Sequence, residues 1–178
     1  MKKYFVLYKP FLVFLFTFFG TYVLLALVYQ FFLNSFEKGQ ADTATRWVAQ
    51  NTEEVLSWFY KSIRIEKVNS EPFFLVNFQN QPVARIVEGC NGISVVILFV
   101  SFVVAFSGSL KNTLLFIFGG SFMIYILNVL RIAVLTVLLY YFPQHLHLLH
   151  GVLFPLIIYG VVFVLWVIWV NKFSKYAK

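Results

Sequence analysis

The chain has 178 residues, of which 61% are hydrophobic and only 12% are charged. Soluble domains carry about 25% charged residues, so the composition excludes a soluble globular protein and indicates one compact bundle in a membrane. The formal net charge of +7 suggests a nucleic-acid partner at first sight, but its placement along the chain argues against one.

The two signs of charge are segregated along the chain. All seven acidic residues lie between the first and second hydrophobic segments: Glu37, Asp42, Glu53, Glu54, Glu66, Glu71 and Glu88. Seven lysines without acidic neighbours lie at the chain ends or in one short loop: Lys2, Lys3, Lys9, Lys111, Lys172, Lys175 and Lys178. This is the positive-inside pattern of a membrane protein rather than a basic patch for phosphates. We therefore expect a multi-pass protein of the cell inner (cytoplasmic) membrane, surrounded by lipid, with both termini in the cytoplasm and no nucleic-acid partner.

The first hydrophobic segment runs from Phe11 to Leu33, directly after Lys9-Pro10. It is long enough to span a bilayer and lacks an obvious small-residue cleavage site. Residues 1–33 are therefore predicted to form an uncleaved signal-anchor helix.

Residues 34–89 form the only polar stretch of any length. Apolar positions recur among the charges of residues 41–60 with a helical period, which predicts an amphipathic helix. Residues 73–78 and 82–87 have strand-like composition around a turn centred on Asn80. We expect a small extracytoplasmic α+β cap between spans 1 and 2, whose aromatic residues suit the bilayer surface.

Residues 90–178 contain three further hydrophobic segments, at about 91–106, 112–142 and 151–170, and then a basic cytoplasmic tail. The predicted fold is therefore an all-α polytopic membrane protein with a four-span helix bundle. Residues 132–149 are too apolar for an aqueous loop: either the third span continues to about Tyr141, or a shallow hairpin is broken at Pro143. The proline favours the continued helix, but the sequence leaves both open.

Three conspicuous residues are predicted to lie at the same depth. Cys90 precedes Lys111 by 21 residues, or about 31 Å of helix. Arg131 follows Lys111 by 20 residues, or about 30 Å, and His150 precedes Lys172 by 22, or about 33 Å. Each span matches a hydrocarbon core of roughly 30 Å. If the lysines lie at the cytoplasmic interface of the membrane, Cys90, Arg131 and His150 therefore all lie at its outer interface.

Cys90 is the only cysteine, which excludes an intramolecular disulfide and a Cys-x-x-Cys redox pair. A lone cysteine is more often a small buried hydrophobe than a nucleophile. Its place at the start of a helix, however, favours a thiolate. Gly89 and Gly92 permit a substrate backbone to approach, although Gly92 could equally be a helix-packing residue.

Arg131 lies within an apolar span, where an arginine is costly and usually faces an interior site. Its alternative is to extend along the bilayer to the headgroups. Asn128, one turn earlier on the same face, favours an inward polar cluster.

His150 is the preferred base among three neighbouring histidines, because His150-Gly151 is expected at the start of the last helix. There its imidazole could deprotonate a thiol and later protonate a leaving amine. His145 and His147 are alternatives, and an ordinary interfacial position is the default for all three. Glu88 could orient His150 or bind substrate, and its role stays open.

The sequence contains no zinc cluster, no glycine-rich phosphate loop and no intramembrane carboxylate pair. It therefore argues against a metallopeptidase and an aspartyl intramembrane protease, and we expect no metal and no cofactor.

Three motifs in order carry a family resemblance: Glu-Gly-Cys-Asn-Gly-Ile at 88–93, Asn-x-x-Arg at 128–131 and His-Gly at 150–151. Over residues 86–170 the chain resembles the exosortase/archaeosortase family, and in its compact size the exosortase F type. The resemblance implies a multi-spanning cysteine transpeptidase with Cys90 as nucleophile and Arg131 and His150 as catalytic partners. It also implies substrates that are exported proteins with a C-terminal motif, a transmembrane helix and a basic tail. Asn91 departs from the family pattern, which commonly has Ser or Ala there.

These observations support a cysteine transpeptidase or protease that cleaves a C-terminal sorting signal at the outer membrane–water interface through a thioester. Asn128, Glu88, Asn91 and Gly92 are the expected supporting residues. A non-enzymatic membrane assembly or transport subunit is the alternative, and a thiol oxidoreductase partner is a third possibility.

Overall fold

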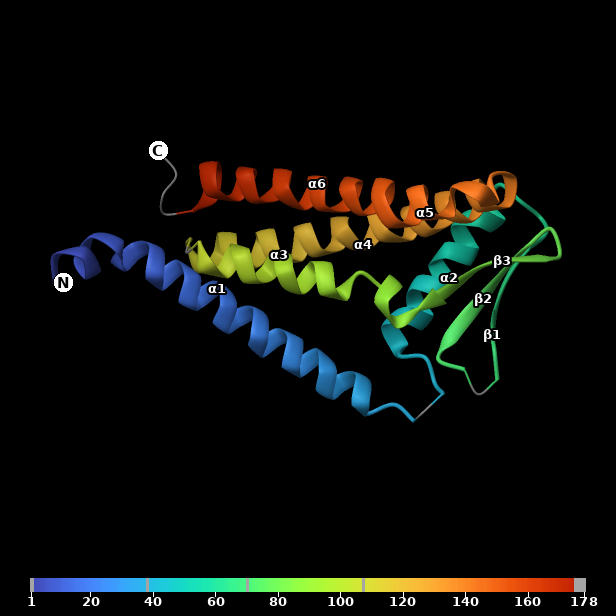
Figure 1. The fold of residues 1–178 in the computed structure, drawn as a ribbon, viewed down its shortest axis with the longest axis horizontal. Coiled ribbons are helices and arrows are strands. Elements are labelled where there is room, and N and C mark those ends of the chain that lie inside the picture. Colours follow the sequence, from blue (N-terminus) through green and yellow to red (C-terminus); the bar gives the residue numbers. More distant parts are fainter. Residues whose placement is uncertain (1, 38, 70, 107, 175–178) are drawn as a thin grey trace.

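The computed structural model describes residues 2–37, 39–69, 71–106 and 108–174, and its long helices run side by side (Figure 1). They are α1 (Lys2–Asn34), α3 (Ile93–Ala105), α4 (Leu110–Tyr141) and α6 (Phe154–Ile168). Helix α2 (Thr43–Ser57) and a small β-sheet cover one end of this bundle. Helix α1 begins at the opposite end, which is also where α6 ends.

Three described helical stretches are long and apolar enough to cross a membrane: Tyr8–Asn34, Leu110–Tyr141 and Pro143–Phe173. The protein is therefore a mostly helical, polytopic membrane protein. Helix α3, which corresponds to the predicted second span, has only 13 residues. Its length of about 20 Å is less than the roughly 30 Å of a hydrocarbon core, so length alone does not establish a fourth span.

Helix α4 is continuous through Arg131 to Tyr141. The Phe142 amide donates to the Leu138 carbonyl oxygen over 2.7 Å, and Pro143 opens a short 3₁₀ turn. The hairpin alternative for this stretch is therefore wrong. The chain reverses through α5 (Leu146–Leu148) and a π-helical turn (Leu149–Leu153) before α6.

The centre of the bundle is filled by large apolar side chains from α3, α4 and α6. A Cβ atom on Gly120 would lie 2.3 Å from Phe99 Cζ, so only glycine lets α4 approach α3 this closely. The indole of Trp169 is fully buried, and its Nε1 donates to the Phe106 carbonyl oxygen over 2.9 Å. This bond fixes the end of α3 against the helical turn Trp169–Phe173 that follows α6.

Helix α2 is the predicted amphipathic helix. It begins at Asp42, whose carboxylate accepts a 3.0 Å hydrogen bond from the Thr45 amide, as expected of an N-cap. Its buried positions include Val48, Ala49 and Leu56, which form one stripe at helical spacing.

The sheet contains strands β1 (Ile63–Lys67), β2 (Phe73–Phe78) and β3 (Gln81–Val87) in the antiparallel order β1-β2-β3. The β2 and β3 strands match the two predicted ones, whereas β1 was not predicted. The turn between β2 and β3 places Gln79 and Asn80 at φ of 51° and 62°, the left-handed pair typical of a tight hairpin. The predicted turn at Asn80 is thus confirmed.

One apolar cluster joins α2 and the sheet to helix α4. Val76 and Ile86 of the sheet pack in it with Val129, Ile132 and Ala133 of α4. This packing holds β3 and the turn that follows it over the middle of α4, where Arg131 lies.

Candidate active site

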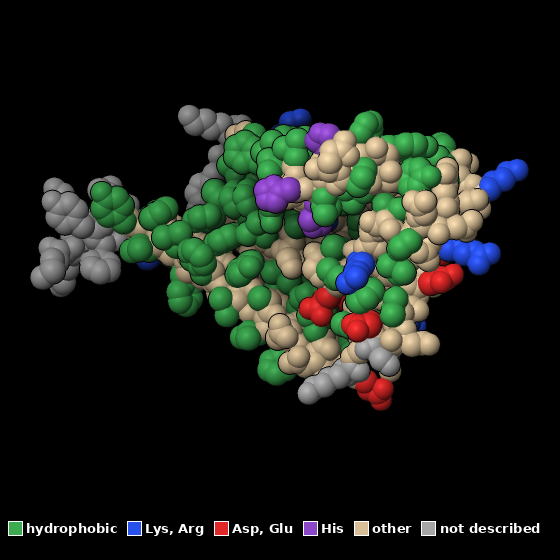
Figure 2. Space-filling view, turned by 45° about the vertical axis from the view of Figure 1, so that its right-hand side comes forward, with side chains coloured by type: hydrophobic (Ala, Val, Ile, Leu, Met, Phe, Trp, Pro, Cys, Tyr) green, Lys and Arg blue, Asp and Glu red, His purple; other side chains and the backbone are tan. Residues whose placement is uncertain are grey.

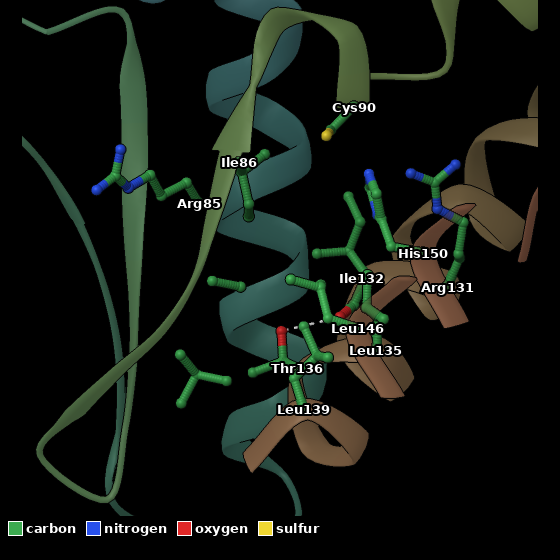
Figure 3. Close-up of a pocket in the computed structure, with 12 residues that line it drawn as sticks. Arg85, Ile86, Cys90, Arg131, Ile132, Leu135, Thr136, Leu139, Leu146 and His150 are labelled. Carbon is green, nitrogen blue, oxygen red and sulfur yellow. Dashed lines mark hydrogen bonds between the residues drawn. The ribbon is translucent and has the colours of Figure 1, made fainter. Parts of the chain in front are cut away.

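A cavity of about 270 Å³ lies between β3, α4 and the beginning of the last helical segment. Cys90, Arg131 and His150 all line it, although they come from three segments distant in the sequence. In Figure 3 the Cys90 side chain and the His150 ring lie at the same end of the pocket, and the Arg131 guanidinium lies beside the ring. The remaining walls are mainly apolar and are formed by Val83, Ala84, Ile86, Ile132, Leu135, Leu139 and Leu146.

Cys90 is the last residue of a 3₁₀ turn, Glu88–Cys90, and α3 begins only at Ile93. The prediction that Cys90 opens the helix is therefore wrong by a few residues, because the turn inserts Asn91 and Gly92 between them. Helix α4 holds this turn through Asn128, which is 2% exposed and whose Nδ2 donates to the Cys90 carbonyl oxygen over 2.7 Å. The Cys90 side chain is half-buried and faces the cavity.

Gly92 serves the packing of this turn rather than the approach of a substrate. Its φ is +80°, and an added Cβ would lie 3.2 Å from Asn128 Cγ. L-residues with a side chain rarely adopt this conformation. Gly89, by contrast, has no atom within 4 Å of such a Cβ, so it leaves open space beside Cys90.

Asn91 supports the turn from the side away from the cavity. It is 4% exposed, and its Oδ1 accepts from the Ile93 amide over 3.0 Å, satisfying one of the free N–H groups that begin α3. Its Nδ2 donates to Tyr29 Oη over 2.7 Å and to Thr45 Oγ1 over 3.3 Å. Sequence reasoning proposed Asn91 as a supporting residue but did not find Tyr29 or Thr45.

Arg131 faces the cavity instead of extending along the bilayer. Its Nε is buried and has no hydrogen-bond partner among the described residues. Buried donors are nearly always paired, so this unpaired N–H is an exception among the described residues. Asn128 lies one turn earlier on α4, as predicted, but uses its amide on the Cys90 backbone.

His150 lies in the π-helical turn Leu149–Leu153. The expectation that it starts the last helix is wrong, because the helical stretch already begins at Pro143, which supplies a favourable first residue. His150 is exposed and lines the cavity, whereas His145 and His147 do not line it. Figure 2 shows the histidines on one face of the molecule, which also carries several acidic side chains.

Glu88 is exposed and makes no side-chain hydrogen bond or ion pair with a described residue. Nothing in the structure links it to His150. Arg85, which sequence reasoning missed, lines the cavity, and its guanidinium carbon lies 5.0 Å from the centroid of the Phe73 ring. Its position five residues before Cys90, as the only charged residue of β3, was the available signal.

The comparisons with known proteins identify the family of the chain. Residues 5–170 match the family model described as transmembrane exosortase (Exosortase_EpsH). No curated protein and no solved structure matches the chain. Because the match covers nearly all of the described helices and every residue of the cavity, the chain belongs to the transmembrane exosortase family.

Proposed function

We propose that this protein is a membrane-embedded cysteine transpeptidase or peptidase that removes the C-terminal sorting signal of exported proteins. The observation that carries the proposal is the shared cavity, which is lined by the only thiol of the chain, an imidazole and a guanidinium. The family membership supports a sorting-signal role. The roles of the individual residues are our inference from the geometry.

In the first step, His150 accepts the thiol proton while Cys90 Sγ attacks the carbonyl carbon of the scissile peptide bond. The carbon–nitrogen bond then breaks, and the proton passes from the imidazolium to the leaving amine. The C-terminal fragment departs with this new amine, and the upstream part remains on Cys90 as a thioester. An amine or water then attacks the thioester and restores the thiol.

Arg131 stabilises the tetrahedral oxyanion or holds the substrate carbonyl oxygen. Its Nε–H lacks an acceptor among the described residues, so donating to a substrate oxygen breaks no existing hydrogen bond of that group. A preorganised donor of this kind contributes roughly 10²–10³-fold to the rate in other acyl-transfer sites. The mainly apolar walls of the cavity strengthen the effect because they lower the local dielectric constant.

The proposed topology places the cavity on the extracytoplasmic side, with both termini in the cytoplasm and α3 as a short fourth crossing. The segregated lysines support this orientation. A substrate with a transmembrane helix and a basic tail would then lie parallel to the bundle, with its tail inside and its cleavage motif at the cavity. Residues 34–89 would form the extracytoplasmic cap that receives the motif.

The proposal is tested by mass spectrometry of the C-termini of exported membrane proteins from wild-type and Cys90→Ala cells. We expect at least one protein to lose its C-terminal helix in wild-type cells and to keep it in Cys90→Ala cells. His150→Ala is expected to reduce processing by about 10²–10⁴-fold. His147→Ala is the matched control, because His147 is exposed nearby but does not line the cavity. Unchanged processing in Cys90→Ala cells, with the variant present in the membrane, would exclude the mechanism.

A further inference from the structure

The cavity runs along the free edge of strand β3. Val83, Ala84, Arg85 and Ile86 all line it, although successive side chains of a strand point to opposite faces of the sheet. The register is irregular beside Val83, but Ala84, Arg85 and Ile86 pair regularly with β2. A cavity that touches successive residues of a regular strand must follow its backbone edge rather than one of its faces.

That edge has no backbone partner within the described parts of the chain. The strand order β1-β2-β3 leaves β3 paired only with β2. No hydrogen bond joins the β3 backbone to another described element. In an antiparallel pair, alternate residues direct their N–H and C=O groups away from the partner strand. Here those groups face the cavity, and an exposed edge of this kind is a template for a further strand.

The opposite wall provides an apolar surface for the side chains of such a strand. It is formed by Ile132, Leu135 and Leu139 of α4 and by Leu146. The hydroxyl of Thr136 on the same wall already donates to the Ile132 carbonyl oxygen over 2.9 Å, so it does not compete for a peptide. The volume of about 270 Å³ is near the lower end of the roughly 300–1,000 Å³ of ligand sites, which suits a short extended segment.

We propose that the segment preceding the transmembrane helix of the substrate adds to β3 as a fourth strand, with its backbone leading to Cys90. This inference rests on the proposed function and describes how the cavity that contains Cys90 binds its substrate. The occupant is an extended peptide with apolar side chains, because the edge offers backbone hydrogen bonds and the far wall offers apolar contacts. Continuity of the edge with the cavity that contains Cys90 and His150 argues for this occupant.

The direction of the added strand follows from the fold. Strand β3 runs from the tip of the hairpin toward the helix bundle and ends at Val87, immediately before the turn that contains Cys90 (Figure 1). A substrate whose motif precedes its membrane helix also runs from the cap toward the bundle. The added strand is therefore parallel to β3, unlike the antiparallel pairs within the sheet.

The test is photocrosslinking in intact cells that carry the Cys90→Ala protein, which binds substrate without cleaving it. p-Benzoylphenylalanine is introduced at Arg85 or Val87, both exposed on β3, and the attached peptide is sequenced by mass spectrometry. Arg64 and Glu66 are the matched controls, because they are exposed at the same spacing on β1, at the other edge of the sheet. Immunoblotting of membranes verifies that each variant is inserted.

We expect adducts at Arg85 and Val87 within one segment that directly precedes a transmembrane helix, and no such adduct from Arg64 or Glu66. The attached residue should shift by two positions toward that helix between Arg85 and Val87, because paired parallel strands advance together. A shift in the opposite direction, equal adducts from β1, or no juxtamembrane adduct would overturn the proposal. The crosslinking result and the C-terminal mass spectrometry test the two proposals separately. If the two-position shift appears but Cys90→Ala cells have the same C-termini as wild-type cells, strand addition is supported and the cleavage proposal fails. If the C-termini differ between the two strains but the shift is missing, only strand addition is overturned.

Discussion

The Asn128 side chain donates a 2.7 Å hydrogen bond to the backbone carbonyl oxygen of Cys90. It thereby ties the turn that carries the thiol to helix α4, one helical turn from Arg131. The polar side chain of an asparagine within an apolar span is thus paired with the Cys90 backbone.

Asn128→Ala should lower both stability and processing. The Cys90 carbonyl oxygen would lose its partner in a part-buried hydrogen bond, which costs about 0.5–1.5 kcal/mol, and the Cys90 backbone would no longer be held against α4. The unfolding midpoint in detergent and the fraction of processed substrate measure the two effects. Asn51→Ala is the control, because Asn51 also donates a side-chain hydrogen bond to α4, over 2.6 Å to Tyr125 Oη, but does not bond to the Cys90 backbone. Equal loss of processing in both variants would show that Asn128 acts through stability alone.

The two glycines beside Cys90 should respond differently to alanine. Gly92→Ala forces a side chain into φ of +80°, 3.2 Å from Asn128 Cγ, and should destabilise the protein by about 1–2 kcal/mol. Gly89→Ala meets no atom within 4 Å and should leave the unfolding midpoint nearly unchanged. Thermal unfolding of both variants in the same detergent checks this. A larger decrease of the unfolding midpoint in Gly89→Ala than in Gly92→Ala would contradict the geometry of the turn.

Much of the site followed from two regular features of the sequence. The rise of a helix and the positions of Lys111 and Lys172 predicted that Cys90, Arg131 and His150 share one depth, and all three line one cavity. Helical period predicted α2, and strand composition around Asn80 predicted β2 and β3. These features are local, so a short window of sequence contains them.

The rest depended on tertiary contacts that no local pattern reports. The hydrogen bond between Asn91 and Tyr29 joins residues 62 positions apart, and nothing near either residue indicates the other. The start of the last helix was misplaced because residues 146–149 are as apolar as the span itself and Pro143 acts as a helix start, not only as a stop. Strand β1 was missed because Ile63 and Ile65 are its only large apolar residues.

Tyr29 should anchor helix α1 to the turn that carries Cys90. Asn91 Nδ2 donates to Tyr29 Oη over 2.7 Å, and Tyr29 is half-buried. Tyr29→Phe should therefore lower the free energy of unfolding by about 0.5–1.5 kcal/mol and reduce the fraction of processed substrate. Tyr22→Phe, on an exposed position of the same helix, should change neither. A double-mutant cycle with Asn91→Ala should show coupling between the two residues; additive effects would exclude the anchor.

Cys90 should be reachable from the extracytoplasmic side, and its being the only cysteine makes the measurement unambiguous. It is half-buried and lines an open cavity, so a membrane-impermeant maleimide should label it in intact spheroplasts. The matched control is Cys90→Ala combined with Ser109→Cys, an exposed position at the start of α4 and at the opposite end of the bundle. That protein should be labelled only after the membrane is permeabilised. The reverse pattern would place the cavity in the cytoplasm, where exported substrates could not reach Cys90, and would exclude the proposed topology.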